Sequence, residues 1–168
     1  MVSGVIQPFN GKENAVKVVI PQNDAEGNQL TSMASSYFLD CTNLVLVSIP
    51  NTIALGDSTF KGCTSLTILM NPVPYTNPVD GCDYCKVSTI GLNVFDGDLA
   101  LDINLYISDL TTIRCKNGGG TSGRKVFNEC GIRRLALPSV TGFESQSDSA
   151  FRGMPNIEYV YFPNWLCT

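Results

Sequence analysis

Residues 38–50 read FLDCTNLVLVSIP, and residues 151–163 read FRGMPNIEYVYFP. Both fit the template F-x-x-C-x-x-L-x-x-V-x-I-P, in which a phenylalanine opens a short apolar run and a proline closes it. Further copies begin at Phe9, Phe60, Phe95 and Phe127, and those at Phe95 and Phe127 are the more degenerate. A repeat of this length indicates a solenoid, in which each unit buries its apolar face against its neighbours.

The second half of each copy alternates apolar and other residues, which is the pattern of a half-buried strand. The proline that usually follows has no N–H to donate, so it ends the strand where the chain turns. We therefore expect a parallel β-solenoid of about six units, with short helical or irregular turns, in a single domain over residues 1–168. The predicted strands lie near residues 15–20, 44–49, 66–70, 101–107, 132–137 and 157–162.

The repeat phenylalanines Phe38, Phe60 and Phe151 are predicted core residues. A Gly or Asp soon after the phenylalanine permits the chain to bend there. Three stretches between repeats are rich in Gly, Pro, Asn or Asp and are interpreted as inserted loops. They are residues 21–29, 72–86 and 116–125.

Two of the best-preserved stretches are GDSTFKGCTSLT at residues 56–67 and AFRGMPNIEYVYFP at residues 150–163. At these residues the chain resembles the BspA-like leucine-rich repeats, a subclass with Cys and Pro at these slots. The resemblance implies a leucine-rich-repeat solenoid. It also implies a surface-exposed or secreted protein used for adhesion and host contact, with phage and eukaryotic parasite proteins as further settings. It offers no catalytic residues to transfer to this chain.

The composition argues against several function classes. The net charge is −4 and 15% of residues are charged, which does not favour a nucleic-acid surface. No apolar run of about 20 residues exists, so we expect no membrane insertion. Residues 1–8, MVSGVIQP, lack the features of a signal peptide. We expect an extracellular, cell-surface or virion protein. The missing signal-peptide features leave two alternatives: the chain is a mature fragment, or it is exported without such a signal.

The chain contains no histidine, which removes histidine-dependent nucleophiles, acid–base catalysts and metal sites. We therefore expect no enzyme, no cofactor and no metal requirement. Residues 118–125, GGGTSGRK, come close to a phosphate-binding loop but fail its last positions, so a flexible loop is the better interpretation. The acidic turns at residues 24–27 and 96–98 lack the spacing of a calcium loop.

Seven cysteines are present. Cys41, Cys63 and Cys130 share one repeat slot, which favours a buried column of small apolar side chains, with disulfides between stacked copies as the alternative. Cys82 and Cys85 form a C-x-x-C. Free thiols, a local disulfide and, least favoured, a zinc site all remain open for this pair.

If Leu44, Val47 and Ile49 face inward, the residues between them face outward, and the same register applies to every strand. The outward row would also include Lys17, Ser48, Asn104 and Ala136. It is apolar and aromatic, and Tyr and Arg carry much of the energy in binding surfaces. The alternative is ordinary β-propensity. The predicted partner-binding residues are Val19, Leu46, Ile68, Met70, Tyr106, Arg134, Tyr159 and Tyr161.

Two functions are compatible with this pattern. The first is a non-catalytic recognition or adhesion module that binds a protein or a glycan through the exposed sheet face. The second is a structural component of a phage or virion assembly. Because Trp165 and Leu166 are too few to cover the last strand, we also expect a homo-oligomer or larger assembly through the C-terminal edge.

Overall fold

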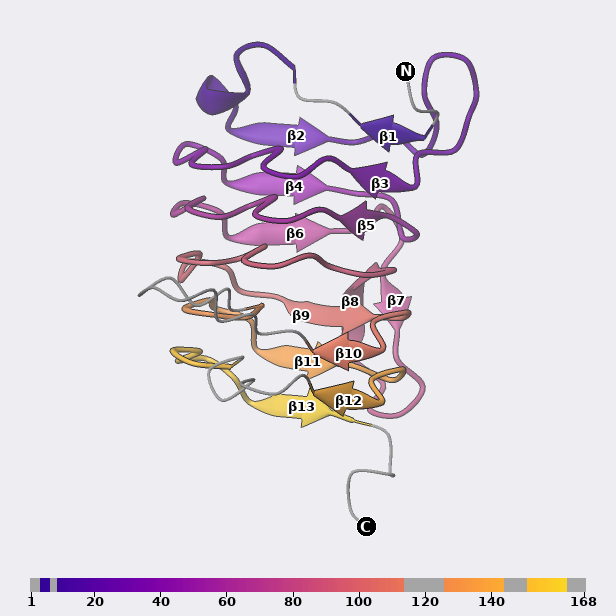
Figure 1. Ribbon diagram of the computed structural model, residues 1–168, viewed down its shortest axis with the longest axis vertical. Coiled ribbons are helices and arrows are strands. Elements are labelled where there is room, and N and C mark those ends of the chain that lie inside the picture. The colour runs from indigo at the N-terminus through magenta and orange to yellow at the C-terminus, as the bar shows by residue number, and fades with distance from the viewer. Residues whose placement is uncertain (1–3, 7–8, 114–125, 144–150, 163–168) are drawn as a thin grey trace.

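The computed structural model describes residues 4–6, 9–113, 126–143 and 151–162. The chain winds into a stack of parallel strands, with its first described strands at one end of the stack and its last at the other (Figure 1). Each predicted repeat strand contains an observed strand, and neighbours pair in parallel within the first three repeats and within the last three. The predicted solenoid is confirmed. These strands are β2 (Lys17–Val19), β4 (Leu46–Ser48), β6 (Ile68–Met70), β9 (Asn104–Ile107), β11 (Arg134–Ala136) and β13 (Tyr159–Tyr161).

The repeat strands lie on one face of the solenoid, which we call the first sheet; its hydrogen-bonded strands fall into two groups, one with β2, β4 and β6 and one with β9, β11 and β13. The register within each group follows the template slot by slot. Val18 aligns with Val47, which in turn aligns with Leu69. Farther along the stack, Leu135 aligns with both Leu105 and Val160. Since side chains alternate between the two faces of a strand, this register places the apolar slots of all repeats on one inner face.

A second sheet, which the sequence reasoning missed, follows each corner. Its strands are only two residues long and pair in parallel. Residue Ile90 continues the row through an isolated bridge to Leu55. Each repeat therefore contributes to two faces of the solenoid. The strands are β1 (Val5–Ile6), β3 (Ser32–Met33), β5 (Ala54–Leu55), β10 (Thr112–Ile113) and β12 (Gly142–Phe143).

The prediction that residues 72–86 form a plain loop is wrong. This segment contains β7 (Tyr75–Thr76) and the start of β8 (Asp83–Val87), which pair as an antiparallel hairpin. On its other side β8 pairs in parallel with β9, so the insertion adds a strand to the first sheet. Asn71 helps to hold β8 in this position. Its buried side-chain amide accepts a hydrogen bond from the backbone N–H of Lys86 and donates one to the C=O of Lys86.

The bends after the repeat phenylalanines share one conformation. The residue two positions after each phenylalanine is in the left-handed region, where an L side chain is strained and glycine is not. Four repeats use glycine, whereas Asp40 (φ 56°) and Glu129 (φ 50°) carry side chains there. The first repeat continues into the 3₁₀ helix η1 (Lys12–Asn14). The predicted role of Gly or Asp in the bend is confirmed.

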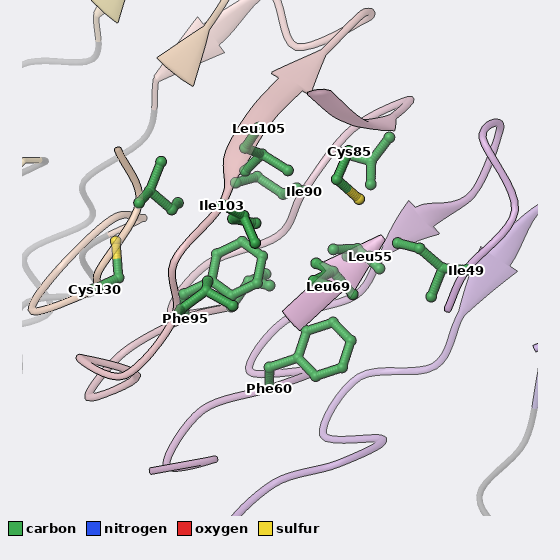
Figure 2. Close-up of a cluster of buried hydrophobic side chains, with 14 of the residues drawn as sticks. Ile49, Leu55, Phe60, Leu69, Cys85, Ile90, Phe95, Ile103, Leu105 and Cys130 are labelled. Carbon is green, nitrogen blue, oxygen red and sulfur yellow. The ribbon is translucent and has the colours of Figure 1, made fainter. Parts of the chain in front are cut away.

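The core is a continuous apolar column between the two sheets. Phe38 and Phe60 are fully buried and stack with ring centroids 5.5 Å apart, and Phe60 stacks on Phe95 at 5.8 Å. Figure 2 shows Phe60 and Phe95 packed with Leu55, Leu69 and other aliphatic side chains. Phe151 is only half-buried, although its ring stacks on Phe127 and meets the ring of Phe162 edge-on, so its prediction as a full core residue is corrected.

The cysteine slot is also buried. Cys41, Cys63 and Cys130 are free thiols in the core. The Sγ of Cys63 donates to the carbonyl of Phe38 at 3.0 Å, and burial raises the pKa of Cys130 to about 12. The buried column predicted from the sequence is therefore present, without bridges between these three residues.

Several other predictions fall outside the described residues: the loop at 116–125, the glycine-rich residues 118–125, and Trp165 with Leu166. Within the described ranges, the chain contains no apolar helix of membrane-spanning length.

Candidate partner-binding face

The N-terminal half of the first sheet exposes apolar side chains on its outer face. Val19 is 60% exposed, Ile68 43% and Met70 40%, and Leu46 between them is half-buried. The exposed Lys17 pairs with Leu46 in the register. The four apolar residues come from three adjacent strands and form one continuous row. We call this set the apolar row: Val19, Leu46, Ile68 and Met70.

Two residues that were predicted to face outward are buried. Ser48 aligns with Val19 on one side and Met70 on the other, and Ala136 aligns with Tyr106 and Tyr161. Each is a small side chain between larger ones, which cover it. The outward register is therefore correct, but the solvent reaches the larger neighbours and not Ser48 or Ala136.

The C-terminal half of the same face carries an aromatic cluster that includes the inserted hairpin. Tyr75 of β7 contacts Tyr106 of β9, with ring centroids 4.5 Å apart. The ammonium group of Lys86 lies 4.8 Å from the Tyr75 ring centroid and 5.7 Å from that of Tyr106. A cation over two ring faces is an attractive arrangement. Burial, and then the Tyr75 hydroxyl, raise the pKa of Tyr106 to about 12.

Asp80 fastens the tip of the hairpin to the sheet. The Tyr84 hydroxyl donates to its Oδ2 at 2.6 Å, and the Arg134 Nη1 lies 3.3 Å from the same oxygen. Burial opposes the charge on Asp80, but Tyr84, the Cys82 amide and Arg134 together lower its pKa below the usual value. Arg134 also lies over the Tyr159 ring, at 5.7 Å. The hairpin thus holds Arg134 in place on the face.

A cleft of about 170 Å³ separates the apolar row from the aromatic cluster. Its walls include Met70 at the end of the apolar row, Pro74 of the hairpin and Asn104 of β9. The cleft lies where β8 enters between β6 and β9.

All eight predicted partner-binding residues lie on this face, and the structure divides them into two groups. Val19, Leu46, Ile68 and Met70 make up the apolar row. Tyr106, Arg134, Tyr159 and Tyr161 belong to the half with the aromatic cluster, where all four are half-buried.

Sequence reasoning missed four residues that complete the cluster: Tyr75, Asp80, Tyr84 and Lys86. The available signal was the run Asp-Tyr-Cys-Lys-Val at 83–87, which alternates like a strand inside a stretch that is otherwise rich in Pro, Gly and Asn. Its Cys85 points into the core beside Leu105, and Figure 2 shows it among the aliphatic side chains.

The described residues offer no group of three or more His, Cys, Asp or Glu side chains that could hold a metal ion. Cys82 and Cys85 are free thiols. They face different surroundings, because Cys85 is buried in the core whereas Cys82 is half-exposed in the hairpin turn. Of the three alternatives left open for the C-x-x-C, the structure has the free thiols.

The geometry of the repeats is matched by a comparison with known families. The family model described as BspA type leucine-rich repeat region, with six copies, matches residues 7–82 and 84–168. The chain belongs to this family. As such it has a leucine-rich-repeat fold with six repeats, rich in strands, of a kind that mediates protein interactions and is typically non-catalytic.

A solved structure shows the same fold. The crystal structure of a T. pallidum leucine-rich repeat protein (TpLRR) superposes with a TM-score of 0.61 at 23% sequence identity. The match covers 93% of this chain and 72% of the T. pallidum chain. No curated protein matches the chain.

Proposed function

We propose that the protein is a non-catalytic recognition module, a single solenoid domain that binds a protein or glycan at a cell or particle surface. The observation that carries the proposal is the apolar row of Val19, Ile68 and Met70, exposed on a rigid sheet beside an aromatic cluster. Contiguous exposed apolar surface with a polar rim is typical of interaction sites. Rigid aromatic side chains bind with little loss of conformational entropy.

The two halves of the face suit different parts of one ligand. The apolar row gains free energy by burying aliphatic surface. The cluster of Tyr75, Lys86 and Tyr106 offers ring faces and a cation, which can stack on a sugar ring or an aromatic side chain. Arg134 is half-buried and already paired with Asp80, so we assign it to positioning the hairpin more than to direct contact. A homo-oligomer through the C-terminal edge remains part of the proposal.

The test is a pair of matched variants screened on arrays of glycans and extracellular proteins. Ile68→Asp/Met70→Asp places two charges in the apolar row. Leu99→Asp makes the same kind of change at an exposed turn away from it, since Leu99 is 52% exposed. We expect the double variant to lose the ligands of the wild type and Leu99→Asp to keep them.

Retention of every ligand by Ile68→Asp/Met70→Asp would contradict the proposal. Sedimentation of the same proteins separates a second possibility. If the wild type self-associates and only the double variant is monomeric, the face is an assembly contact, as expected for a structural component of a particle.

A further inference from the structure

The second sheet is interrupted between Ile90 and β10. A cavity of about 320 Å³ opens there, lined by residues 89–92 on one side and 109–112 on the other, with Asp57 and Val126 completing the described lining. This volume is within the range of pockets that hold ligands. In Figure 1 the segment that follows β8 lies well separated from β10, whereas β10 and β12 are adjacent. We call this opening the slot.

The two walls of the slot are neighbouring segments that begin together and then separate. The N–H of Ser108 donates to the C=O of Val87, and the N–H of Asp109 donates to the C=O of Ser88, as between neighbouring repeats elsewhere in the stack. Beyond Asp109 the described chain makes no further bonds of this kind to residues 89–92, because residues 110–113 pass to the side of β12 instead. Among the described residues, no strand occupies the position between residues 89–92 and residues 110–113.

Backbone groups point into this vacancy from the upper wall. The C=O of Thr89 and the N–H of Gly91 both bond to Leu55. Since successive residues of a strand direct their backbone groups to opposite sides, the N–H and C=O of Ile90 face the slot. Within the described chain neither has a hydrogen-bond partner, although Ile90 is only 7% exposed.

The lower wall is its counterpart. The C=O of Thr111 accepts from Thr141 of the neighbouring repeat, and Thr112 aligns with Gly142. The backbone N–H and C=O of Thr112 therefore point away from β12 and toward Ile90. Two donors and two acceptors therefore face the slot from its two walls. Those of Ile90 are buried and Thr112 is half-buried, and buried backbone groups normally find partners.

The charged side chains in the described lining of the slot are both acidic. Asp57 and Asp109 lie at its wall and are exposed, and the described lining has no basic side chain. Asp57 also accepts from the N–H of Leu92 at 2.9 Å, which fixes its carboxylate beside the upper wall.

We propose that the slot binds an extended, basic peptide segment of a partner protein, which adds a strand to the second sheet between Ile90 and Thr112. Main-chain hydrogen bonds to both walls supply the recognition of an extended backbone, as in other cases of strand addition. Asp57 and Asp109 select Lys or Arg side chains on the added strand. This site is separate from the apolar row and the aromatic cluster.

The test is an NMR titration of the whole protein with the peptide Ac-Thr-Lys-Val-Lys-Thr-NH₂ at up to millimolar concentration. We expect saturable shifts of the Ile90 and Thr112 amides and slower hydrogen exchange at both. Two control peptides separate the contributions: one with glutamate in place of lysine, and one with N-methylated backbone amides. Both should bind at least tenfold more weakly.

Variants provide the matched protein control. Asp57→Asn/Asp109→Asn should weaken binding at least tenfold, whereas Glu13→Gln/Glu26→Gln removes the same charge from exposed sites elsewhere and should not. Equal binding of the N-methylated peptide would overturn strand addition, and so would the absence of shifts at Ile90 and Thr112. Amides already protected in the free protein would also overturn it, because the slot would then be filled by this chain itself.

Discussion

Replacing Asp98 with cysteine should stabilise the protein at neutral pH. Asp98 occupies the repeat slot that elsewhere holds Cys41, Cys63 or Cys130. It is fully buried, and neither carboxyl oxygen has a hydrogen-bond partner among the described residues. Burial raises its pKa from 3.8 to about 8, although the nearby backbone amides of Cys63 and Gly62 favour the charged form.

The raised pKa of Asp98 converts into a pH-dependent free energy. The folded state prefers the protonated acid, so the contribution of this group to stability is complete below pH 3.8 and is lost as the pH rises toward about 8. Each pKa unit corresponds to about 1.4 kcal/mol, so roughly 4 kcal/mol is lost by pH 7. That is a large share of the 5–15 kcal/mol typical of a folded domain.

The assay is urea unfolding followed by far-UV circular dichroism, under reducing conditions, at several values between pH 4 and pH 8. We expect Asp98→Cys to raise the free energy of unfolding by about 4 kcal/mol at pH 7 and by less than about 1 kcal/mol at pH 4. Asp102→Cys, at an exposed carboxylate, is the control and should lack this trend. A gain for Asp98→Cys that is the same at every pH would refute the reasoning.

Three further changes test the packing, the bends and the hairpin. Phe60→Ala should cost about 3–5 kcal/mol in urea unfolding and Phe151→Ala clearly less, because Phe60 is fully buried and stacked between two rings whereas Phe151 is half-buried; equal costs would contradict the assigned repeat register. Glu129→Gly should raise the thermal midpoint and increase the free energy of unfolding by about 1 kcal/mol, because glycine adopts the left-handed backbone of this position without strain; a lower midpoint would show that the Glu129 side chain makes a compensating contact. Arg134→Met should leave global stability within about 1 kcal/mol but speed amide exchange in the hairpin, because it removes the ion pair to Asp80; unchanged exchange would mean that the hairpin is held by other contacts.

The repeat strands of the first sheet could be predicted from the sequence because each of them carries at least two inward apolar residues at a nearly constant distance from a phenylalanine. The second sheet has strands of two residues, such as β5, with a single inward side chain, Leu55. One apolar residue between turn residues has no period, so the pattern cannot distinguish such a strand from a turn. Pairing with the neighbouring repeats, and not local propensity, makes it a strand.

The binding face was predicted in register but not in its surroundings. Alternation indicates which side a residue faces, whereas exposure depends on the size of its neighbours on adjacent strands, as Ser48 and Ala136 show. The hairpin was hidden by its composition, since the Pro, Gly and Asn residues around Tyr75 are typical of loops. Its position over Arg134 depends on contacts between residues that are 54 apart in sequence.

The insertion in the third repeat accounts for both irregular features of the solenoid. β6 and β9 begin side by side, with the N–H of Asp102 bonded to Thr67, and β8 then fills the gap as they separate. The first sheet therefore has one additional strand, β8. Among the described residues the second sheet gains none, because Ile90 remains with β5 and β10 pairs with β12. A stack that has one more strand on one face than on the other must leave a gap between strands on the face that has fewer. The aromatic cluster and the slot are thus two consequences of the same insertion, and shortening residues 73–83 should remove the cluster and close the slot together.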